Sequence, residues 1–220
     1  MKKLAIFDLD GTLVSSLKDI TKSINEAFEY FEINSITEEQ CMNALGHGAR
    51  SLVIKCLEYA GYNTESKTEL EEIINKYNQT YGNSSNSNTI PFDGILDMLK
   101  NIRIAGYKTA IVSNKPHAFT LKMSEDLFSG LIDLTFGQSE LFPKKPDPSI
   151  IYHTLSKLGF DKCDSIYIGD SDVDVMTAKN SGLSSIAVSW GYRSRDILES
   201  SSPDYIVDSV EDLEKILYII

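Results

Sequence analysis

The pattern of hydrophobic and polar positions changes its period along the chain. Residues 4–7 are consecutive apolar residues, which is typical of a strand buried on both faces. Residues 15–82 then carry apolar side chains three and four positions apart, the spacing of amphipathic helices. From residue 91 onward, short apolar runs alternate with helical patterns. Such an alternation predicts a parallel sheet covered on both faces by helices.

The first part of the chain predicts helices only. They are expected at 17–31, 37–45, 49–60 and 70–81. Ser15 or Ser16 is suited to cap the first helix, and the spacing from Thr37 to Gln40 fits a capping box. Residues 82–89 are small, polar and without a period, so we expect a linker or surface loop there.

The second part of the chain predicts alternating strands and helices. Strands are expected at 108–112, 131–136, 165–168, 184–188 and 205–207, and helices at 94–105, 117–127, 148–158, 172–181 and 210–217. We therefore expect an α/β fold with a Rossmann-like parallel sheet core. The core would comprise residues 1–14 and 88–220, and residues 15–87 would form an inserted all-helical cap domain with its linker.

Composition narrows the class of protein. The chain has 220 residues and a formal net charge of −11, which argues against a general nucleic-acid binder, since these are usually basic. Three scattered cysteines favour a reducing compartment without a disulfide framework. No signal-peptide pattern and no apolar stretch of membrane-spanning length is present in the sequence. We expect a cytoplasmic protein, a monomer or homodimer, that binds neither nucleic acid nor membrane.

Polar residues follow three of the predicted strands. Asp8 and Asp10 follow the first strand, Ser113 a second and Asp170 a third. The carboxyl ends of parallel strands share one edge of a sheet, so these groups are expected to converge. Unpaired buried carboxylates are unfavourable, and a divalent cation such as Mg²⁺ would remove that penalty. The alternative is that residues 8–11 are only a strand-ending turn.

The same residues supply what phosphoryl transfer requires. One carboxylate can act as a nucleophile and a second as general acid and base. Ser113 can donate a hydrogen bond to a phosphoryl oxygen, and Lys145, in an intervening loop, can offset negative charge. Asp170 can complete the oxygen shell of a cation.

Four short motifs give this set a family resemblance. They are Asp8-Leu9-Asp10-Gly11-Thr12, Ser113-Asn114, Lys145-Pro146 and Gly169-Asp170-Ser171-Asp172-Val173-Asp174. In order and spacing they resemble the four motifs of the haloacid dehalogenase-like hydrolase superfamily. The second acid at position 10 implies phosphate chemistry, because the dehalogenases of the superfamily lack it.

The resemblance implies a role for each matching residue. Asp8 would be the nucleophile and Asp10 the acid and base. Mg²⁺ would be held by the Asp8 side chain, the Asp10 backbone carbonyl and Asp170, with Asp174 and Ser171 supporting the metal site. Lys145 and Ser113 would act on the phosphoryl group, and Thr12 and Asn114 would bind substrate, the latter through its backbone.

The helical block resembles the small cap of phosphoglycolate phosphatase-like members. Within residues 45–52, Gly46 would let the backbone approach a ligand and Arg50 could clamp an anionic group. His47 and Lys115 are further candidate substrate contacts. The alternatives are a solvated Arg50, a simple loop residue at position 47 and a surface lysine at position 115.

These inferences lead to a magnesium-dependent phosphatase of small phosphorylated metabolites that works through an aspartyl-phosphate. Phosphoglycolate is the leading candidate substrate. A β-phosphoglucomutase-like isomerase or a pyrophosphatase on the same core is the alternative. A non-catalytic binding protein is a further alternative, although Asp8, Asp10, Lys145 and Asp170 are all present.

Overall fold

The computed structural model describes residues 3–84 and 88–219. The chain divides into two compact units, one formed by Met1–Val14 and Pro91–Ile220 and the other by Ser15–Ile90. The sequence pattern placed the second boundary between residues 87 and 88, three residues earlier. That the second unit serves as a cap stays a prediction. No helix in the described ranges combines the length and the apolar character needed to cross a membrane.

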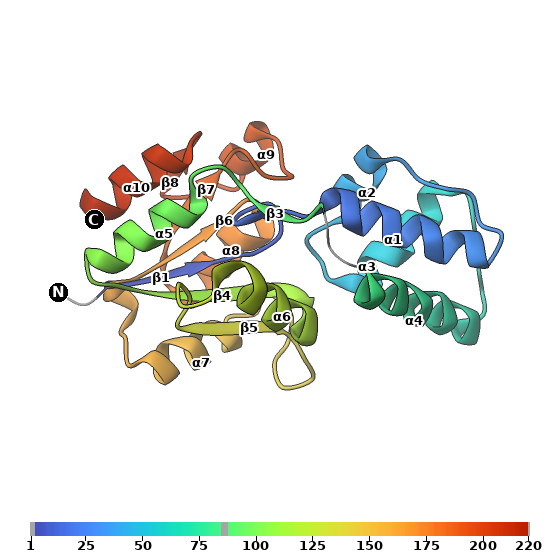
Figure 1. Ribbon diagram of the computed structural model, residues 1–220, viewed down its shortest axis with the longest axis horizontal. Helices are drawn as coiled ribbons and strands as arrows, with labels where there is room; N and C mark the ends of the chain where they lie inside the picture. The colour runs from blue at the N-terminus through green and yellow to red at the C-terminus, as the bar shows by residue number, and fades with distance from the viewer. Residues whose placement is uncertain (1–2, 85–87, 220) are drawn as a thin grey trace. The chain divides into compact units, whose positions relative to one another are not determined.

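The first unit contains a parallel sheet, which confirms the predicted α/β fold class (Figure 1). Over the described residues its strands lie in the order β5 (Leu134–Gln138), β4 (Tyr107–Pro116), β1 (Lys3–Phe7), β6 (Ser165–Gly169), β7 (Ser184–Val188) and β8 (Tyr205–Val207). Each neighbouring pair is parallel.

Strand β1 lies between β4 and β6, and its pairing with them determines where the predicted site residues lie. It pairs with β4 on one side and β6 on the other, and Phe7 is in register with both Ile111 and Ile168. Asp8 follows Phe7 directly, while Ser113 and Asp170 each come two residues after those partners. The register therefore brings these three residues to one edge of the sheet. This edge is where ligands bind in open α/β sheets.

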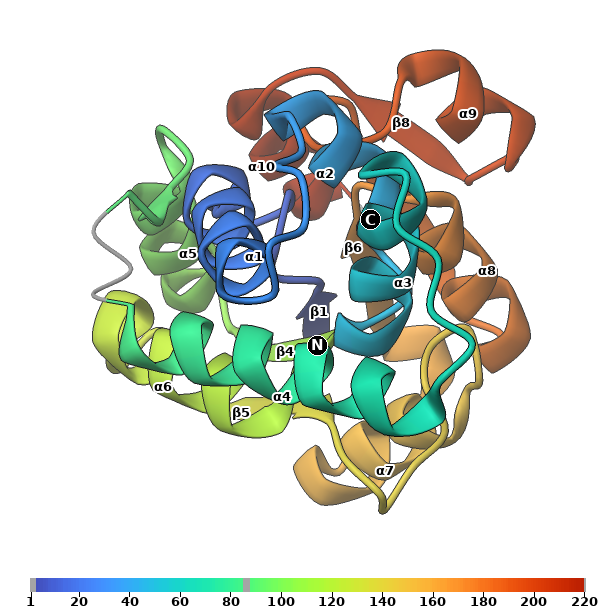
Figure 2. The ribbon, with the colours of Figure 1, turned by 90° about the vertical axis from the view of Figure 1, so that its right-hand side faces the viewer.

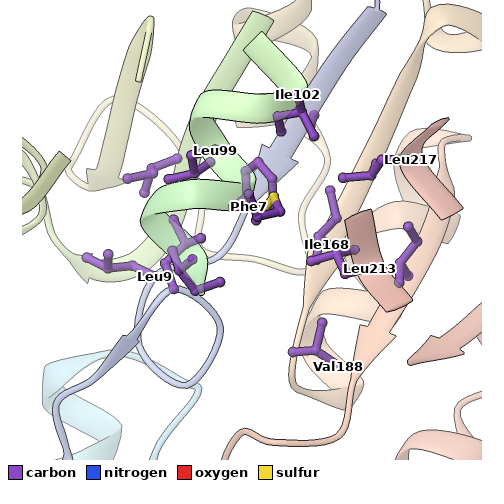
Figure 3. Close-up of a cluster of buried hydrophobic side chains, with 14 of the residues drawn as sticks. Phe7, Leu9, Leu99, Ile102, Ile168, Val188, Leu213 and Leu217 are labelled. Carbon is purple, nitrogen blue, oxygen red and sulfur yellow. The ribbon is translucent and has the colours of Figure 1, made fainter. Parts of the chain in front are cut away.

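Helices cover both faces of the sheet. Packed on one face are α5 (Ile95–Ile104), α6 (His117–Phe128) and α10 (Val210–Ile219), and on the other α7 (Ser149–Leu158), α8 (Asp172–Ser181) and α9 (Arg195–Ser200). Figure 3 shows the first of these layers, in which Phe7 and Ile168 of the strands meet Leu99, Leu213 and Leu217 of the helices. These side chains have no exposed surface, so their burial contributes strongly to stability.

The second unit is built from α1 (Leu17–Tyr30), α2 (Glu38–Ala44), α3 (Ala49–Tyr59) and α4 (Lys67–Asn83) (Figure 2). The capping box at the start of α2 is confirmed, because Gln40 N donates to Thr37 Oγ1 and Thr37 N donates to Gln40 Oε1. The expectation that a serine side chain caps α1 is wrong. Ser16 occupies the N-cap position, but its side chain makes no capping hydrogen bond.

Several boundaries differ from the sequence prediction. Gly82 and Asn83 belong to the last turn of α4 and not to a linker, and residues 85–87 of the expected linker lie outside the described residues. The segment 131–133 is not strand, because the Asp133 side chain accepts hydrogen bonds from Thr109, Arg103 and Lys108 and ends the loop there. Elements that the pattern missed are β2 (Val14–Ser15), β3 (Ile90–Pro91), α9 and the 3₁₀ turn Lys162–Asp164. Each of these is too short to show a period.

A buried carboxylate fastens α1 to the returning chain. Asp19 is 1% exposed and accepts hydrogen bonds from Asn88 N at 3.1 Å, Asn88 Nδ2 at 2.8 Å and Thr89 Oγ1 at 2.7 Å. Burial alone would raise the pKa of Asp19, but these hydrogen bonds outweigh it and lower the pKa. The carboxylate form is therefore the one that the fold stabilises.

Replacing this carboxylate should destabilise the protein in a pH-dependent way. We expect Asp19→Ala to lower the free energy of unfolding by about 2 kcal/mol at pH 7, since hydrogen bonds to a charged group are lost. Because the folded-state pKa of Asp19 is lowered, its carboxylate stabilises the fold fully at pH values above the unfolded-state pKa near 3.8. This stabilisation is lost as the pH falls through the folded-state pKa. Urea unfolding of the wild type and of Asp19→Ala at pH 7 and at pH 3 measures this contribution to the free energy of unfolding.

The matched control is Asp97→Ala, which removes an exposed aspartate paired with Lys100 on α5. It should change stability little at either pH. Equal effects of the two substitutions at pH 7 would contradict the role given to Asp19.

Candidate active site

Asp8 lies one residue beyond β1, where its backbone N–H donates to Ile168 O at 2.9 Å. Its Oδ1 is buried and lies 2.9 Å from Lys145 Nζ as an ion pair, yet it accepts no hydrogen bond of good geometry from the described residues. Burial raises the pKa of Asp8 to about 6, although the Lys145 charge opposes the rise. Asp8 Oδ1 is thus buried beside a cation, without a hydrogen bond from the described residues.

The ammonium of Lys145 is surrounded by three oxygen atoms. They are Asp174 Oδ1 at 2.7 Å, Asp8 Oδ1 at 2.9 Å and the Tyr167 hydroxyl at 2.9 Å. Burial alone would lower the pKa of Lys145, but Asp174 and Asp8 outweigh it and hold the pKa well above its usual value. Lys145 therefore provides a permanent positive charge in a buried place.

The backbone of Lys145 is fixed by Asn114, the residue after Ser113 on β4. Lys145 N donates to Asn114 Oδ1 at 2.8 Å, and Asn114 Nδ2 donates to Lys145 O at 3.1 Å. The Asn114 side chain thus holds the loop that carries Lys145. Substrate binding by Asn114 through its backbone stays a prediction.

Asp174 is engaged through both of its oxygens at the start of α8. Ser171 N and Oγ donate to Asp174 Oδ2, and Asp174 N donates to Ser171 Oγ, which forms a capping box. Lys145 takes the other oxygen, Oδ1. A Cβ at Gly169 would lie 2.3 Å from Asp174, so glycine is needed for this close approach. Asp174 and Ser171 are placed to support the site.

Asp170 is buried between two glycines. A Cβ at Gly11 would lie 2.3 Å from Asp170 Oδ2, and one at Gly191 would lie 2.2 Å from Asp170 Cβ. Thr12 Oγ1 donates to Asp170 Oδ1 at 3.0 Å, and Tyr192 N donates to Oδ2 at 2.8 Å. Burial, reinforced by the charges of Asp174 and Asp8, raises the pKa of Asp170 to about 8.

Residues 191 and 192 were missed as site residues by the sequence reasoning. Glycine followed by tyrosine after a strand carries no chemical signature, and Tyr192 acts through its backbone N–H. The hydroxyl of Thr12 is engaged with Asp170, so in this structure it orients a carboxylate. Contact of Thr12 with substrate stays a prediction.

The carboxylates fit a divalent cation. Oxygen atoms of Asp8, Asp170 and Asp174 lie within 4.8 Å of one another, which identifies an acidic cluster that could hold a metal ion. Both oxygens of Asp174 already accept hydrogen bonds, whereas Asp8 Oδ1 accepts none from the described residues. A hard cation prefers such oxygen ligands and would offset both the burial and the mutual repulsion that raise the pKa of Asp170.

A second ion pair holds Asp10. Lys115 Nζ lies 3.1 Å from each carboxylate oxygen of Asp10, and Lys115 N donates to Ser113 Oγ at 3.3 Å. The Lys115 side chain is only 6% exposed, so the alternative of a surface lysine is wrong. The structure brings Ser113, Lys115 and Asp10 together at the edge where Asp8 also lies.

The remaining candidates lie in the second unit. Gly46 and Gly48 adopt φ values of +103° and +82°, which favour glycine, and the intervening His47 is exposed. Arg50 forms an ion pair with Glu71 of α4, and its side chain is about half exposed. The substrate contacts of Gly46, His47 and Arg50 stay predictions.

Comparison with known proteins identifies the family. The family model described as haloacid dehalogenase-like hydrolase matches residues 5–188. The chain belongs to the haloacid dehalogenase-like hydrolases. This membership confirms the superfamily predicted from the four motifs.

Relatives of this haloacid dehalogenase-like hydrolase match over its whole length. A phosphoglycolate phosphatase from Haemophilus influenzae (strain 86-028NP) is 30% identical and covers 98% of both chains. Phosphoglycolate phosphatase 1 from Pseudomonas aeruginosa is 29% identical over 97% of this chain and 79% of its own. The predicted resemblance to phosphoglycolate phosphatase-like members and the assignment as an enzyme of the phosphatase class are confirmed.

Solved structures agree with the fold of this hydrolase. A crystal structure from Lactobacillus delbrueckii subsp. bulgaricus, of a protein predicted to be a phosphoglycolate phosphatase, has a TM-score of 0.93 and 34% identity and covers 99% of both chains. A haloacid dehalogenase-like family hydrolase from Streptococcus pneumoniae has a TM-score of 0.86 and 25% identity, covering 100% of this chain and 99% of its own. The Rossmann-like α/β architecture is therefore confirmed.

The raised pKa of Asp170 predicts how stability varies with pH when a chelator is present. The folded-state pKa near 8 exceeds the unfolded value of 3.8, so the folded state binds more protons between these values. Stability should consequently fall as the pH rises from 5 to 8. Asp170→Ala removes this proton uptake, so the fall of stability with pH should be shallower in the variant.

Thermal and urea unfolding in chelator at pH 5, 6, 7 and 8 would measure both slopes. Asp126→Asn, on the exposed face of α6, should keep the wild-type slope. Parallel pH profiles of the wild type and Asp170→Ala would show that Asp170 does not titrate as stated.

Proposed function

We propose that this protein is a magnesium-dependent phosphatase that hydrolyses small phosphorylated metabolites through an aspartyl-phosphate, with phosphoglycolate as the leading candidate substrate. The observation that carries the proposal is the buried Asp8 Oδ1, which has Lys145 Nζ at 2.9 Å and no hydrogen bond from the described residues. A carboxylate attacks in its charged form, which the neighbouring ammonium stabilises, and no hydrogen bond from the described residues has to be broken first. Full-length relatives named phosphoglycolate phosphatase support the substrate.

The metal would be held by the side chains of Asp8 and Asp170 and by the backbone carbonyl of Asp10. Mg²⁺ fits these hard oxygen donors, and when bound it neutralises charge on the carboxylates and on the phosphoryl oxygens. Asp174 and Ser171 would hold the surrounding groups in place through the capping box at the start of α8.

In the first half-reaction, Asp8 attacks phosphorus and the bond from phosphorus to the leaving oxygen breaks. Asp10 gives a proton to that oxygen, and the product is an alcohol such as glycolate together with phosphorylated Asp8. Ser113 donates to a phosphoryl oxygen, and the charge of Lys145 stabilises the transferring group. Lys115 holds Asp10 at the same edge of the sheet.

In the second half-reaction, Asp10 takes a proton from water. The resulting hydroxide attacks phosphorus, the bond to Asp8 breaks, and inorganic phosphate leaves with Asp8 regenerated. Asp10 returns to its starting protonation state over the cycle as a whole. The two acids therefore divide the chemistry between nucleophilic and proton-transfer steps.

Selection of substrate is assigned to the second unit. Residues 15–87 would act as a cap that excludes bulk water during the first half-reaction. Gly46, His47 and Arg50 would contact the part of the substrate beyond the phosphoryl group. Arg50 would then exchange its exposed partner Glu71 for an anionic group such as a carboxylate.

A panel of phosphoesters tests the function. Phosphate release would be measured with and without Mg²⁺ from phosphoglycolate, β-glucose 1-phosphate, pyrophosphate and nucleoside monophosphates. We expect Mg²⁺-dependent release with phosphoglycolate preferred. Preference for another ester would keep the roles of Asp8 and Asp10 and would refute the substrate. Isomerisation of β-glucose 1-phosphate without net release would favour the mutase, and inactivity towards all compounds would refute the phosphatase.

The nucleophile can be tested directly by Asp8→Asn. The amide nitrogen and weaker oxygen cannot form the aspartyl-phosphate, so we expect kcat to fall by at least about 10³-fold. Circular dichroism should show an unchanged fold, and Asp126→Asn should retain wild-type activity as the matched control. Turnover by Asp8→Asn within tenfold of the wild type would rule out this assignment.

A further inference from the structure

Tyr167 is a buried phenol at the active-site edge that the mechanism above does not use. It lies on β6, three residues before Asp170, and is 1% exposed. Its neighbours Ile166 and Ile168 pack on the opposite face of the sheet from Tyr167. The alternation of the strand thus directs one polar aromatic side chain to the face where Lys145 lies.

The hydroxyl of Tyr167 has three polar neighbours. Lys145 Nζ lies at 2.9 Å, Val112 O at 3.0 Å and Asp174 Oδ1 at 3.3 Å. A phenol has one hydrogen to donate, and the backbone carbonyl of Val112 is the nearer of the two acceptors. The Tyr167 oxygen is thereby left to accept from the Lys145 ammonium.

This contact completes the surroundings of the Lys145 ammonium. The Lys145 ammonium donates to Asp174 Oδ1 at 2.7 Å and to the Tyr167 hydroxyl at 2.9 Å, and it forms an ion pair with Asp8 Oδ1 at 2.9 Å. Tyr167 differs from the other two because it is neutral. Burial, partly opposed by the charge of Lys145, keeps its pKa well above the usual value, so the phenol retains its proton.

We propose that Tyr167 is a positioning residue for catalysis, which together with Asp174 fixes the rotation of the Lys145 ammonium so that its remaining N–H is directed to the edge where the phosphoryl group would lie beside Asp8. Without this acceptor the ammonium keeps two charged partners and loses its third anchor. Its charge then has no single orientation relative to the nucleophile. The proposal rests on the proposed function, because it assigns Tyr167 to the action of Lys145 in phosphoryl transfer.

The chain offers a matched control in Tyr107. This tyrosine is also buried, lies at the start of β4 and donates to Leu217 O on α10. Tyr107 pairs in register with Lys3, at the opposite end of β1 from Asp8. Removing either hydroxyl deprives one backbone carbonyl of a partner, but only Tyr167 contacts Lys145.

The test compares Tyr167→Phe with Tyr107→Phe. We expect Tyr167→Phe to lower kcat for phosphate release by about tenfold while KM changes less than threefold, because an oriented charge matters most as the phosphoryl group transfers. Tyr107→Phe should lower the melting temperature and leave both kinetic constants unchanged. Wild-type kinetics in Tyr167→Phe, or an equal fall of kcat in the two variants, would overturn the proposal.

A second readout does not depend on turnover. In ¹⁵N NMR spectra, the ammonium of Lys145 should give a slowly exchanging signal in the wild type and in Tyr107→Phe. Lys145→Met assigns that signal by its disappearance. The signal should broaden or exchange faster in Tyr167→Phe, and an unchanged signal there would overturn the proposal.

The two readouts separate this proposal from the proposed function. If the wild-type protein releases no phosphate from any ester, the proposed function fails, and the NMR signal alone decides whether Tyr167 orients Lys145. If Tyr167→Phe does not fold, 3-fluorotyrosine at position 167 replaces it, because it keeps the shape and makes the oxygen a poorer acceptor. The same fall in kcat is expected with it, in smaller measure, and unchanged kinetics would overturn the proposal.

Discussion

The attraction between one buried ammonium and the carboxylates around it is the interaction on which the site depends. Lys145 is the cation that contacts both Asp8 and Asp174, and its side chain is 3% exposed. Carboxylates removed from water repel one another and favour protonation, which appears as the raised pKa values of Asp8 and Asp170. These charges are held in fixed places by their surroundings. The Asn114 side chain binds the Lys145 backbone, and the capping box at the start of α8 holds Asp174. Gly11 and Gly191 approach Asp170 closely and so confine its side chain.

The sequence was sufficient for the architecture because local patterns carry it. Which face of an element is buried decides where its apolar residues fall. This explains the apolar run at 4–7, the helical periods of 15–82 and the later alternation. Parallel pairing then follows from the strand-helix order, and it brings Asp8, Ser113 and Asp170 to one edge. The capping box at Thr37 is equally local, since its two partners are three residues apart.

What could not be predicted depends on partners distant in the chain. Lys115 and Asp10 are 105 residues apart, and nothing near either residue indicates that they meet. Thr12 reaches Asp170 across 158 residues, so its hydroxyl could be expected at the site without its partner being known. Tyr167 was hidden for a different reason. In the pattern of a buried strand, a tyrosine cannot be told from other large hydrophobic residues. The role of its hydroxyl becomes visible only in the structure, where Lys145 lies beside it.

The side chain of Asn114 imitates the hydrogen bonding of a neighbouring strand, because it satisfies both the N–H and the carbonyl of Lys145. This lysine is consequently anchored to β4 and not to the stretch of chain that precedes it. Residues 139–144, most of them exposed, connect β5 to that anchor. Because the anchor lies on β4, a substitution at an exposed position of this stretch should leave the ammonium where it is. The position of the central charge is thus separated from the exposed surface beside it.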